Sequence, residues 1–244
     1  MGYIHLLEEA IQFRELTLEV IFQVYIVQGF FFVFFLIMGI IILSRGLNRI
    51  NLTFSNFYFS IATAFFLNFL FVPLANDFLM NILYFLTLFF LYLGSFFLVL
   101  FTILVKDPKK LSLRKELLLL AFYWALLIGM VFIPKGLTFN ESTDFHPVYS
   151  DFFILYLMLL LTICLIPTLT YSLQIYNKLK NQELRLRWRS FILGIIGYYI
   201  FAYGTLIIYK ITLGVIVFVW SFITIILIIF SSYAIYHGFI RRLN

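Results

Sequence analysis

Long apolar segments alternate with short polar connections along the chain. Seven segments contain no Asp, Glu, Lys, Arg or His, and each is about 17 to 28 residues long. They are Val20–Leu43, Phe54–Ala75, Phe78–Val105, Leu117–Ile133, Phe152–Tyr176, Phe191–Tyr209 and Ile211–Tyr233. A helix needs roughly 20 residues to cross the ~30 Å hydrocarbon layer of a bilayer. The pattern therefore predicts an all-α, polytopic membrane protein built as a bundle of seven transmembrane helices.

The composition favours the same class. Hydrophobic residues make up 64% of the chain and charged residues 11%, whereas soluble domains are about 25% charged. A soluble fold of this length could not hide so much apolar surface, so the bilayer is the expected partner. The net charge of +6 does not indicate nucleic-acid binding, because the basic residues are divided among short connections.

The basic residues lie in alternate connections. The first, third and fifth connections and the C-terminal tail hold 14 of the 17 Lys and Arg residues, and the N-terminal segment with the other connections holds eight of the 11 acidic residues. The positive-inside rule then places the basic connections in the cytoplasm. This predicts a multi-pass protein of the cell membrane with its N-terminus outside and its C-terminus inside.

The ends of the chain have separate expected roles. Ile4, Leu7, Ile11 and Leu18 share a helical face, so residues 1–17 are predicted to form an amphipathic segment. The alternative is that the first membrane helix begins earlier. Residues 18–236 form the predicted seven-helix domain, and residues 237–244 a short cytoplasmic tail.

Ionisable residues are missing from the apolar cores. Proton pumps, ion-driven transporters and intramembrane proteases need such groups at membrane depth, so we expect no enzymatic activity, no catalytic residues and no cofactor. The single cysteine, Cys164, lies within the fifth apolar segment. We interpret it as a buried side chain and expect no metal site.

Uncharged polar residues gather in the predicted outer halves of the helices. The candidate ligand-binding residues are Gln23, Gln28, Asn68, Asn81, Tyr84 and Tyr203. Such residues could bind a small or amphipathic ligand in a shallow pocket open to the outside. The alternative is that they hydrogen-bond one helix to another, where each pair contributes about 0.6 to 2 kcal/mol.

Two further patterns concern the predicted sixth helix. Gly194, Gly197 and Gly204 lie on one face of it, which predicts close approach of a neighbouring helix. The connection before this helix carries Lys178, Lys180, Arg185, Arg187 and Arg189, interleaved with leucines and Trp188. This basic connection is predicted to contact lipid or a partner protein, and it could extend the helix inward as an amphipathic surface.

The last third of the chain resembles a known family. The basic run Tyr176–Arg189 leads into Ser190–Gly194, and the seventh segment ends in Ser231–Tyr236. This arrangement is similar to the seven-helix membrane sensor region found at the N-terminus of some histidine kinases. The resemblance implies ligand sensing, but in that family the output domain follows on the same chain. Here eight residues follow Tyr236, so a sensor would act through a partner subunit.

Three functions are consistent with these patterns. The first is a sensor or receptor-like module without its own output domain. The alternative is a non-catalytic structural or assembly subunit of a multi-subunit membrane complex. A small-solute carrier comes third, because such carriers pair two similar halves. Pro73 lies near the outer end of the second segment, whereas Pro167 lies in the inner half of the fifth, so the halves show no matching repeat.

Overall fold

Short polar side chains begin four of the long helices in the computed structural model, which describes residues 18–74, 76–138, 147–208, 210 and 214–240. Asn48, Asn76, Ser112 and Asn181 accept backbone N–H groups from α4 (Arg49–Phe71), α5 (Asp77–Lys106), α6 (Leu113–Gly129) and α8 (Gln182–Ile208), respectively. Each such cap contributes about 1 kcal/mol to helix stability. The caps let a helix begin in the polar connection, so α8 begins well before the apolar segment at Phe191.

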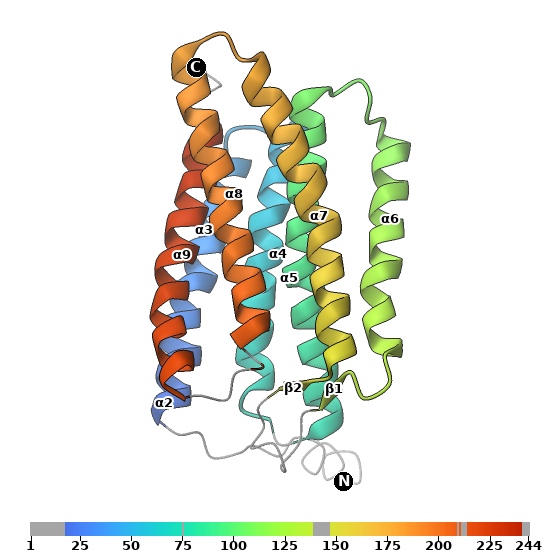
Figure 1. Cartoon of the computed structure of the whole chain (residues 1–244), viewed down its shortest axis with the longest axis vertical. Coiled ribbons are helices and arrows are strands. Elements are labelled where there is room, and N and C mark those ends of the chain that lie inside the picture. The colour runs from blue at the N-terminus through green and yellow to red at the C-terminus, as the bar shows by residue number, and fades with distance from the viewer. Residues whose placement is uncertain (1–17, 75, 139–146, 209, 211–213, 241–244) are drawn as a thin grey trace, which may run out of the picture. The chain divides into compact units, whose positions relative to one another are not determined.

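Seven helices in the described part of the chain are long and apolar enough to cross a membrane, which confirms the predicted number. The chain begins with α2 (Leu18–Ile21), the π-helix η1 (Phe22–Gln28) and α3 (Gly29–Leu43), and the first of the seven spans runs from Val24 in η1 to Leu43. After α4, α5 and α6 come the 3₁₀ turn η2 (Met130–Phe132), α7 (Asp151–Lys178), α8 and α9 (Gly214–Ile240) (Figure 1). These helices indicate a multi-pass membrane protein. The predicted amphipathic segment 1–17 lies outside the described residues, and α9 continues past Tyr236 to Ile240.

The chain divides into two compact units. Unit 1 comprises Met1–Gly94 and Tyr123–Ser150, and unit 2 comprises Ser95–Phe122 and Asp151–Asn244. Helices α5 and α6 are therefore each shared between the units. Unit 1 holds the first two membrane helices and the first half of α5, whereas unit 2 holds α7, α8 and α9.

In unit 1, α3 and α4 form an antiparallel pair joined by a tight turn. Gly46 has a φ of +134°, a conformation that side chains with a Cβ rarely adopt. The Asn51 side chain donates to the Gly46 carbonyl at 3.1 Å, and the Asn48 side chain caps α4. Aromatic rings fill the interface, with Phe31 lying 5.6 Å from Phe65 between ring centroids.

A short antiparallel ribbon lies in unit 1, between η2 and α7 along the chain. Its strands are β1 (Leu137–Thr138) and β2 (Val148–Tyr149), with Leu137 paired to Tyr149. The apolar pattern of this segment predicts only a connection, because two-residue strands are too short to show an alternating pattern. Tyr149 also bonds through its hydroxyl to the hydroxyl of Tyr84 in α5, so the ribbon is held against the helix.

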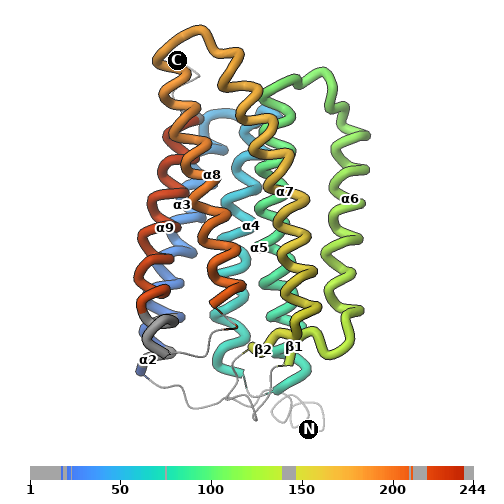
Figure 2. The backbone as a smooth tube through the Cα atoms, viewed as in Figure 1, coloured from blue at the N-terminus to red at the C-terminus, as the bar shows by residue number. Residues whose placement is uncertain are grey.

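In unit 2, α8 and α9 pack as close antiparallel neighbours (Figure 2). A Cβ at Gly194 would lie 2.7 Å from both the Ser231 carbonyl oxygen and the Ile235 nitrogen. Gly197 faces the Ser231 side chain, and Gly204 faces the Trp220 ring. The structure therefore confirms the predicted close approach along the glycine face of α8.

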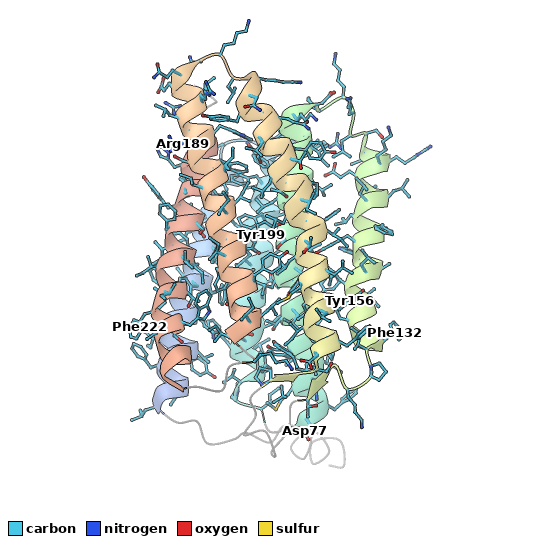
Figure 3. All side chains as sticks on the ribbon, viewed as in Figure 1. Asp77, Phe132, Tyr156, Arg189, Tyr199 and Phe222 are labelled. Carbon is cyan, nitrogen blue, oxygen red and sulfur yellow. The ribbon has the colours of Figure 1, made fainter. Side chains whose placement is uncertain are left out.

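Apolar side chains also cover the outside of the helices. Figure 3 shows Phe222 on the outer side of α9, where 57% of its surface is exposed. Buried aromatic residues line the interior, and in unit 2 the Phe191 ring lies 5.5 Å from that of Phe101. A protein surrounded by hydrocarbon is expected to have an apolar exterior as well as an apolar interior, as these helices do.

Candidate functional site

Two amide side chains meet within unit 1. Gln28 is the last residue of the π-helix η1, and Asn68 lies near the end of α4. The Asn68 amide nitrogen donates to the Gln28 amide oxygen at 2.9 Å. The amide oxygen of Asn68 is buried and has no hydrogen-bond partner in the described part of the chain. We call these two residues the amide pair.

The free hydrogen-bonding capacity of the amide pair is defined by its chemistry. Gln28 retains the donors of its own amide group, and Asn68 retains an acceptor. Turning both amide groups over exchanges these roles but still leaves a donor on one side chain and an acceptor on the other. The pair can therefore bind a group that both donates and accepts, such as a hydroxyl or a neutral amide.

Aromatic residues lie close to the amide pair along the two helices that carry it. Tyr25, one turn before Gln28, stacks on Phe69 with 5.9 Å between ring centroids. Phe32 lies edge-on to Phe69, also at 5.9 Å. Gly29 also lies near Phe69, because a Cβ at this position would be in ordinary van der Waals contact with the Phe69 ring, at 3.7 Å. The polar pair is thus bordered by an apolar wall suited to an amphipathic molecule.

The π-helix changes the direction in which Gln28 points. Seven consecutive residues, Phe22–Gln28, adopt this conformation before α3 resumes as an α-helix. A π-helical turn is wider than an α-helical one, and such turns occur frequently at functional sites. An α-helical pattern of apolar residues gives no sign of this change, so the face on which Gln28 lies could not be predicted from the sequence.

Other predicted ligand-binding residues have separate partners. Asn81 donates to the carbonyl of Asp77 in its own helix at 2.7 Å, and Tyr84 contacts Tyr149. Tyr203 belongs to unit 2, where its hydroxyl lies 2.6 Å from that of Thr162 in α7. The side chain of Gln23 lies outside the described residues. Of the six candidates, the structure joins only Gln28 to Asn68 through a described side-chain hydrogen bond.

A row of buried hydroxyl groups in unit 2 was missed by the sequence reasoning. Ser95 in α5 and Tyr198 in α8 share a hydrogen bond of 3.0 Å between their hydroxyl oxygens. Thr168 bonds back to the Cys164 carbonyl at 2.7 Å, and both residues are fully buried. The adjacent Tyr199 hydroxyl is buried without a hydrogen-bond partner in the described part of the chain. Figure 3 places Tyr199 near the middle of α8.

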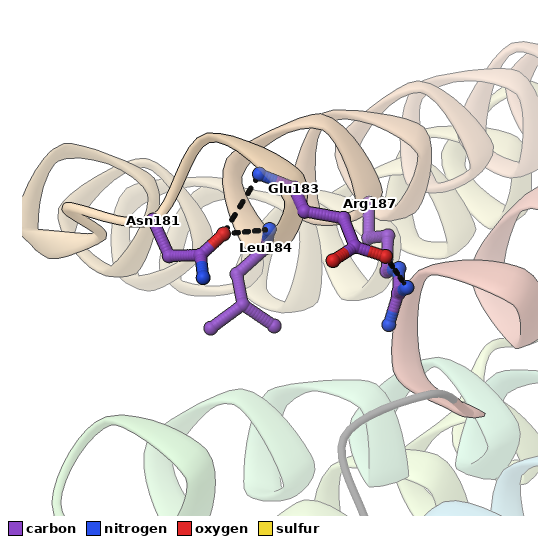
Figure 4. Close-up of polar contacts among 4 residues, drawn as sticks. All are labelled: Asn181, Glu183, Leu184 and Arg187. Carbon is purple, nitrogen blue, oxygen red and sulfur yellow. Dashed lines mark hydrogen bonds and ion pairs between the residues drawn. The ribbon is translucent and has the colours of Figure 1, made fainter.

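The basic connection before the sixth apolar segment is largely helical. Asn181 accepts the backbone N–H groups of Glu183 and Leu184 at 2.8 and 3.2 Å, which begins α8 (Figure 4). Arg187 then pairs with Glu183 one turn earlier. The predicted extension of the sixth helix into this connection is therefore confirmed, and its cytoplasmic location stays a prediction. Lys178 ends α7, and Lys180 lies between the two helices.

Trp188 anchors this extension to the rest of unit 2. Its indole N–H donates to the Ser172 carbonyl of α7 at 2.7 Å, and its side chain is 2% exposed. The indole also stacks on Phe191 at 4.6 Å between ring centroids. Nearby, the Arg185 guanidinium lies 4.6 Å from the centre of the Tyr176 ring. The extension is thus a packed element of unit 2.

The chain matches no known family model, no curated protein and no solved structure. Among the described residues, no group of three or more His, Cys, Asp or Glu side chains could hold a metal ion. The amide pair, the buried hydroxyl groups and the helical basic extension are consequently the features from which a function can be argued.

Proposed function

We propose that this chain is a sensor or receptor-like module of the cell membrane that binds a small amphipathic ligand at the amide pair. The supporting observation is the buried Asn68 amide oxygen, which lacks a partner in the described part of the chain. Leaving a buried acceptor unpaired costs about 1 to 3 kcal/mol. A ligand that donates to this oxygen recovers that free energy on binding.

The expected ligand has a neutral head and an apolar body. No Asp, Glu, Lys, Arg or His lies in the apolar segments that carry Gln28 and Asn68, so a charged head would be desolvated without compensation. A hydroxyl or carboxamide head satisfies both amide side chains. Its hydrocarbon part would lie against Tyr25 and Phe69, whose rings stack on each other near the pair.

The distribution of charge supports an orientation for this site. With the basic connections in the cytoplasm, the N-terminus is outside and Gln28 lies in the outer half of the first membrane helix. A ligand would then enter from the outside or from the outer leaflet. The resemblance to the sensor region of histidine kinases agrees with this role. The signal would pass to a partner subunit at the cytoplasmic face.

Alkyl probes of one chain length test the proposal. We expect decanol and decanamide, but not decane, to raise the thermal unfolding midpoint of the detergent-solubilised protein. In the Asn68→Leu variant, the probe concentration needed for the same stabilisation should rise by about three- to thirtyfold for both polar probes. This range corresponds to the loss of one hydrogen bond of about 0.6 to 2 kcal/mol. Each variant is compared with its own unfolding midpoint without probe.

Thr63→Val is the matched control. Thr63 is on the same helix as Asn68, but its hydroxyl donates to the Phe59 carbonyl of that helix at 2.9 Å. This variant should respond to the probes as the parent does. Equal stabilisation by decane, or an Asn68→Leu variant that responds like the parent, would contradict a binding site at the amide pair.

A specific observation favours the assembly subunit as a second candidate. In the most apolar part of the α6 span, 17% of residues are buried, against 67% in α5. Exposed residues along α6 include Phe122 and Trp124. A photo-crosslinker at Phe122 should give one discrete protein adduct in native membranes if α6 contacts a partner. A crosslinker at Phe222 in α9 is the control, and lipid adducts alone at both positions would rule against this candidate.

A further inference from the structure

The three arginines at the start of α8 differ in their surroundings. Arg187 is paired with Glu183, and its side chain is only 13% exposed. Its backbone carbonyl faces Gly238 of α9, where an added Cβ would lie 2.9 Å away. Arg185 and Arg189 are exposed. The basic connection therefore contains one arginine paired within α8 and two exposed arginines, of which Arg185 also lies over the Tyr176 ring of α7.

The two exposed arginines continue the apolar outer face of α8. At about 100° per residue, Arg185, Leu186 and Arg189 fall within an arc of about 100°. The same arc continues along the helix through Leu193, Ile196 and Ile200, which are all exposed large hydrophobic residues. Trp188, which is buried, lies outside this arc, about 60° from Arg185 around the helix axis. One helical face thus presents two cations followed by a stripe of exposed aliphatic side chains.

The position of this face along the helix matches a membrane boundary. Arg189 stands two residues before the uncharged segment that begins at Phe191, and Arg185 lies one turn further from it. Figure 3 shows Arg189 near the N-terminal end of α8. Side chains one turn apart on a helix are about 5 to 6 Å apart at their Cβ atoms, so both guanidinium groups can reach one phosphate group. Guanidinium groups bind phosphate oxygens in pairs of parallel hydrogen bonds.

Charge complementarity selects the occupant. Glu183, the one acidic residue of the extension, lies on the other side of the helix with Arg187. The outer arc therefore carries positive charge without a neutralising carboxylate from α8. The adjoining Leu193, Ile196 and Ile200 would not contribute to the binding of a free anion, but they can pack against an acyl chain. Such an occupant is an anionic phospholipid.

We propose that the outer face of α8 is a binding site for one anionic phospholipid. Its phosphate lies between Arg185 and Arg189, and an acyl chain follows Leu193, Ile196 and Ile200. Trp188 holds the extension in line with the membrane helix through its hydrogen bond to Ser172 and its stacking on Phe191. Basic pockets on the cytoplasmic side of membrane helices attract acidic lipids. The proposal does not depend on ligand binding at the amide pair.

The test uses native mass spectrometry to measure the binding of single lipid molecules to the full-length protein in a non-ionic detergent. Dioleoylphosphatidylglycerol is the anionic probe and dioleoylphosphatidylcholine the zwitterionic one. We expect the Arg185→Gln, Arg189→Gln double variant to bind phosphatidylglycerol about 25-fold more weakly, or about fivefold for each arginine. Its binding of phosphatidylcholine should be unchanged. An unchanged affinity for phosphatidylglycerol would overturn the proposal.

Two further variants separate the site from net charge and from folding. Lys109→Gln with Lys110→Gln removes the same charge from the exposed connection before α6 and should change phosphatidylglycerol binding less than twofold. Arg187→Gln removes the pair with Glu183, so it should lower the unfolding midpoint without changing the preference for phosphatidylglycerol. Either variant weakening phosphatidylglycerol binding as much as the double arginine variant would overturn the site.

A competition experiment distinguishes a phospholipid from a free phosphate compound as the ligand of the two arginines. Glycerol 3-phosphate has the charged group without acyl chains, so it should not displace phosphatidylglycerol at equal concentration. Displacement would show a site for free anions and would overturn the lipid assignment. Arg185→Lys with Arg189→Lys keeps the charge and is expected to fold as the parent does. It should retain the preference for phosphatidylglycerol with reduced affinity, and equal affinity would overturn the proposed bidentate contact.

Discussion

Gly194→Ala tests whether the contact between α8 and α9 depends on the absence of a side chain. The new Cβ would lie 2.7 Å from the Ser231 carbonyl oxygen and 2.7 Å from the Ile235 nitrogen. Both are backbone atoms of α9, so a change of rotamer cannot relieve the clash. The two helices must move apart, and Gly197 and Gly204 would lose their close contacts as well.

The expected magnitude follows from two opposing effects. Overpacking a well-packed interior costs about 1 to 3 kcal/mol. Replacing Gly by Ala within a helix returns about 0.5 to 1 kcal/mol. The net loss in the free energy of unfolding should therefore lie between about 0 and 2.5 kcal/mol, with a central value of about 1 kcal/mol. For chains of this size, the central value corresponds to a fall of about 2 to 4 °C in the unfolding midpoint.

Gly29→Ala is the matched control, because it is the same substitution in another membrane helix. The Cβ added there would lie 3.7 Å from the Phe69 ring, an ordinary contact. This variant should be as stable as the parent or slightly more stable. Both variants and the parent would be heated in one detergent and followed by near-ultraviolet circular dichroism. A Gly194→Ala variant that is as stable as Gly29→Ala would refute the packing argument.

Two other predictions concern neighbouring tyrosines and the orientation in the membrane. Tyr198→Phe breaks the hydrogen bond to Ser95 and should lower the free energy of unfolding by about 1 kcal/mol. Tyr199→Phe removes a buried hydroxyl that has no partner in the described part of the chain, so it should leave the stability unchanged or raise it. Denaturant titration of the two variants would compare them, and a larger loss for Tyr199→Phe would contradict the assignment. Single cysteines at positions 142 and 181, in a Cys164→Ala background, should be labelled by an impermeant thiol reagent on intact cells at the first position only. Labelling at the second position alone would reverse the predicted topology.

The arrangement of apolar segments could be predicted because the bilayer acts on each segment separately. A run such as Phe78–Val105 without a charge is stable only as a helix in hydrocarbon, since its backbone groups must bond within the segment. The number of spans therefore follows from local composition. The glycine face of α8 was predicted for a similar reason, because residues three and seven positions apart share a side of any α-helix.

The partners of the polar side chains depended on the tertiary structure. Gln28 and Asn68 are 40 positions apart, and their hydrogen bond requires both a π-helical turn and the packing of the first helix on α4. Tyr84 was expected at a ligand site, but it contacts Tyr149 of a ribbon too short to leave a pattern in the sequence. Neither contact follows from apolar periodicity.

The basic connection shows where local and tertiary information separate. Its charges, its leucines and Trp188 are visible in the sequence, and they correctly indicated an amphipathic extension of the helix. The sequence could not distinguish Arg187 from Arg185 and Arg189, because all three are arginines within five residues. The difference arises from the rotation of α8 about its axis, which Trp188 determines by bonding to Ser172 in α7. Segment length and charge set how the chain enters the membrane, whereas contacts between helices set which side of each helix is free to bind.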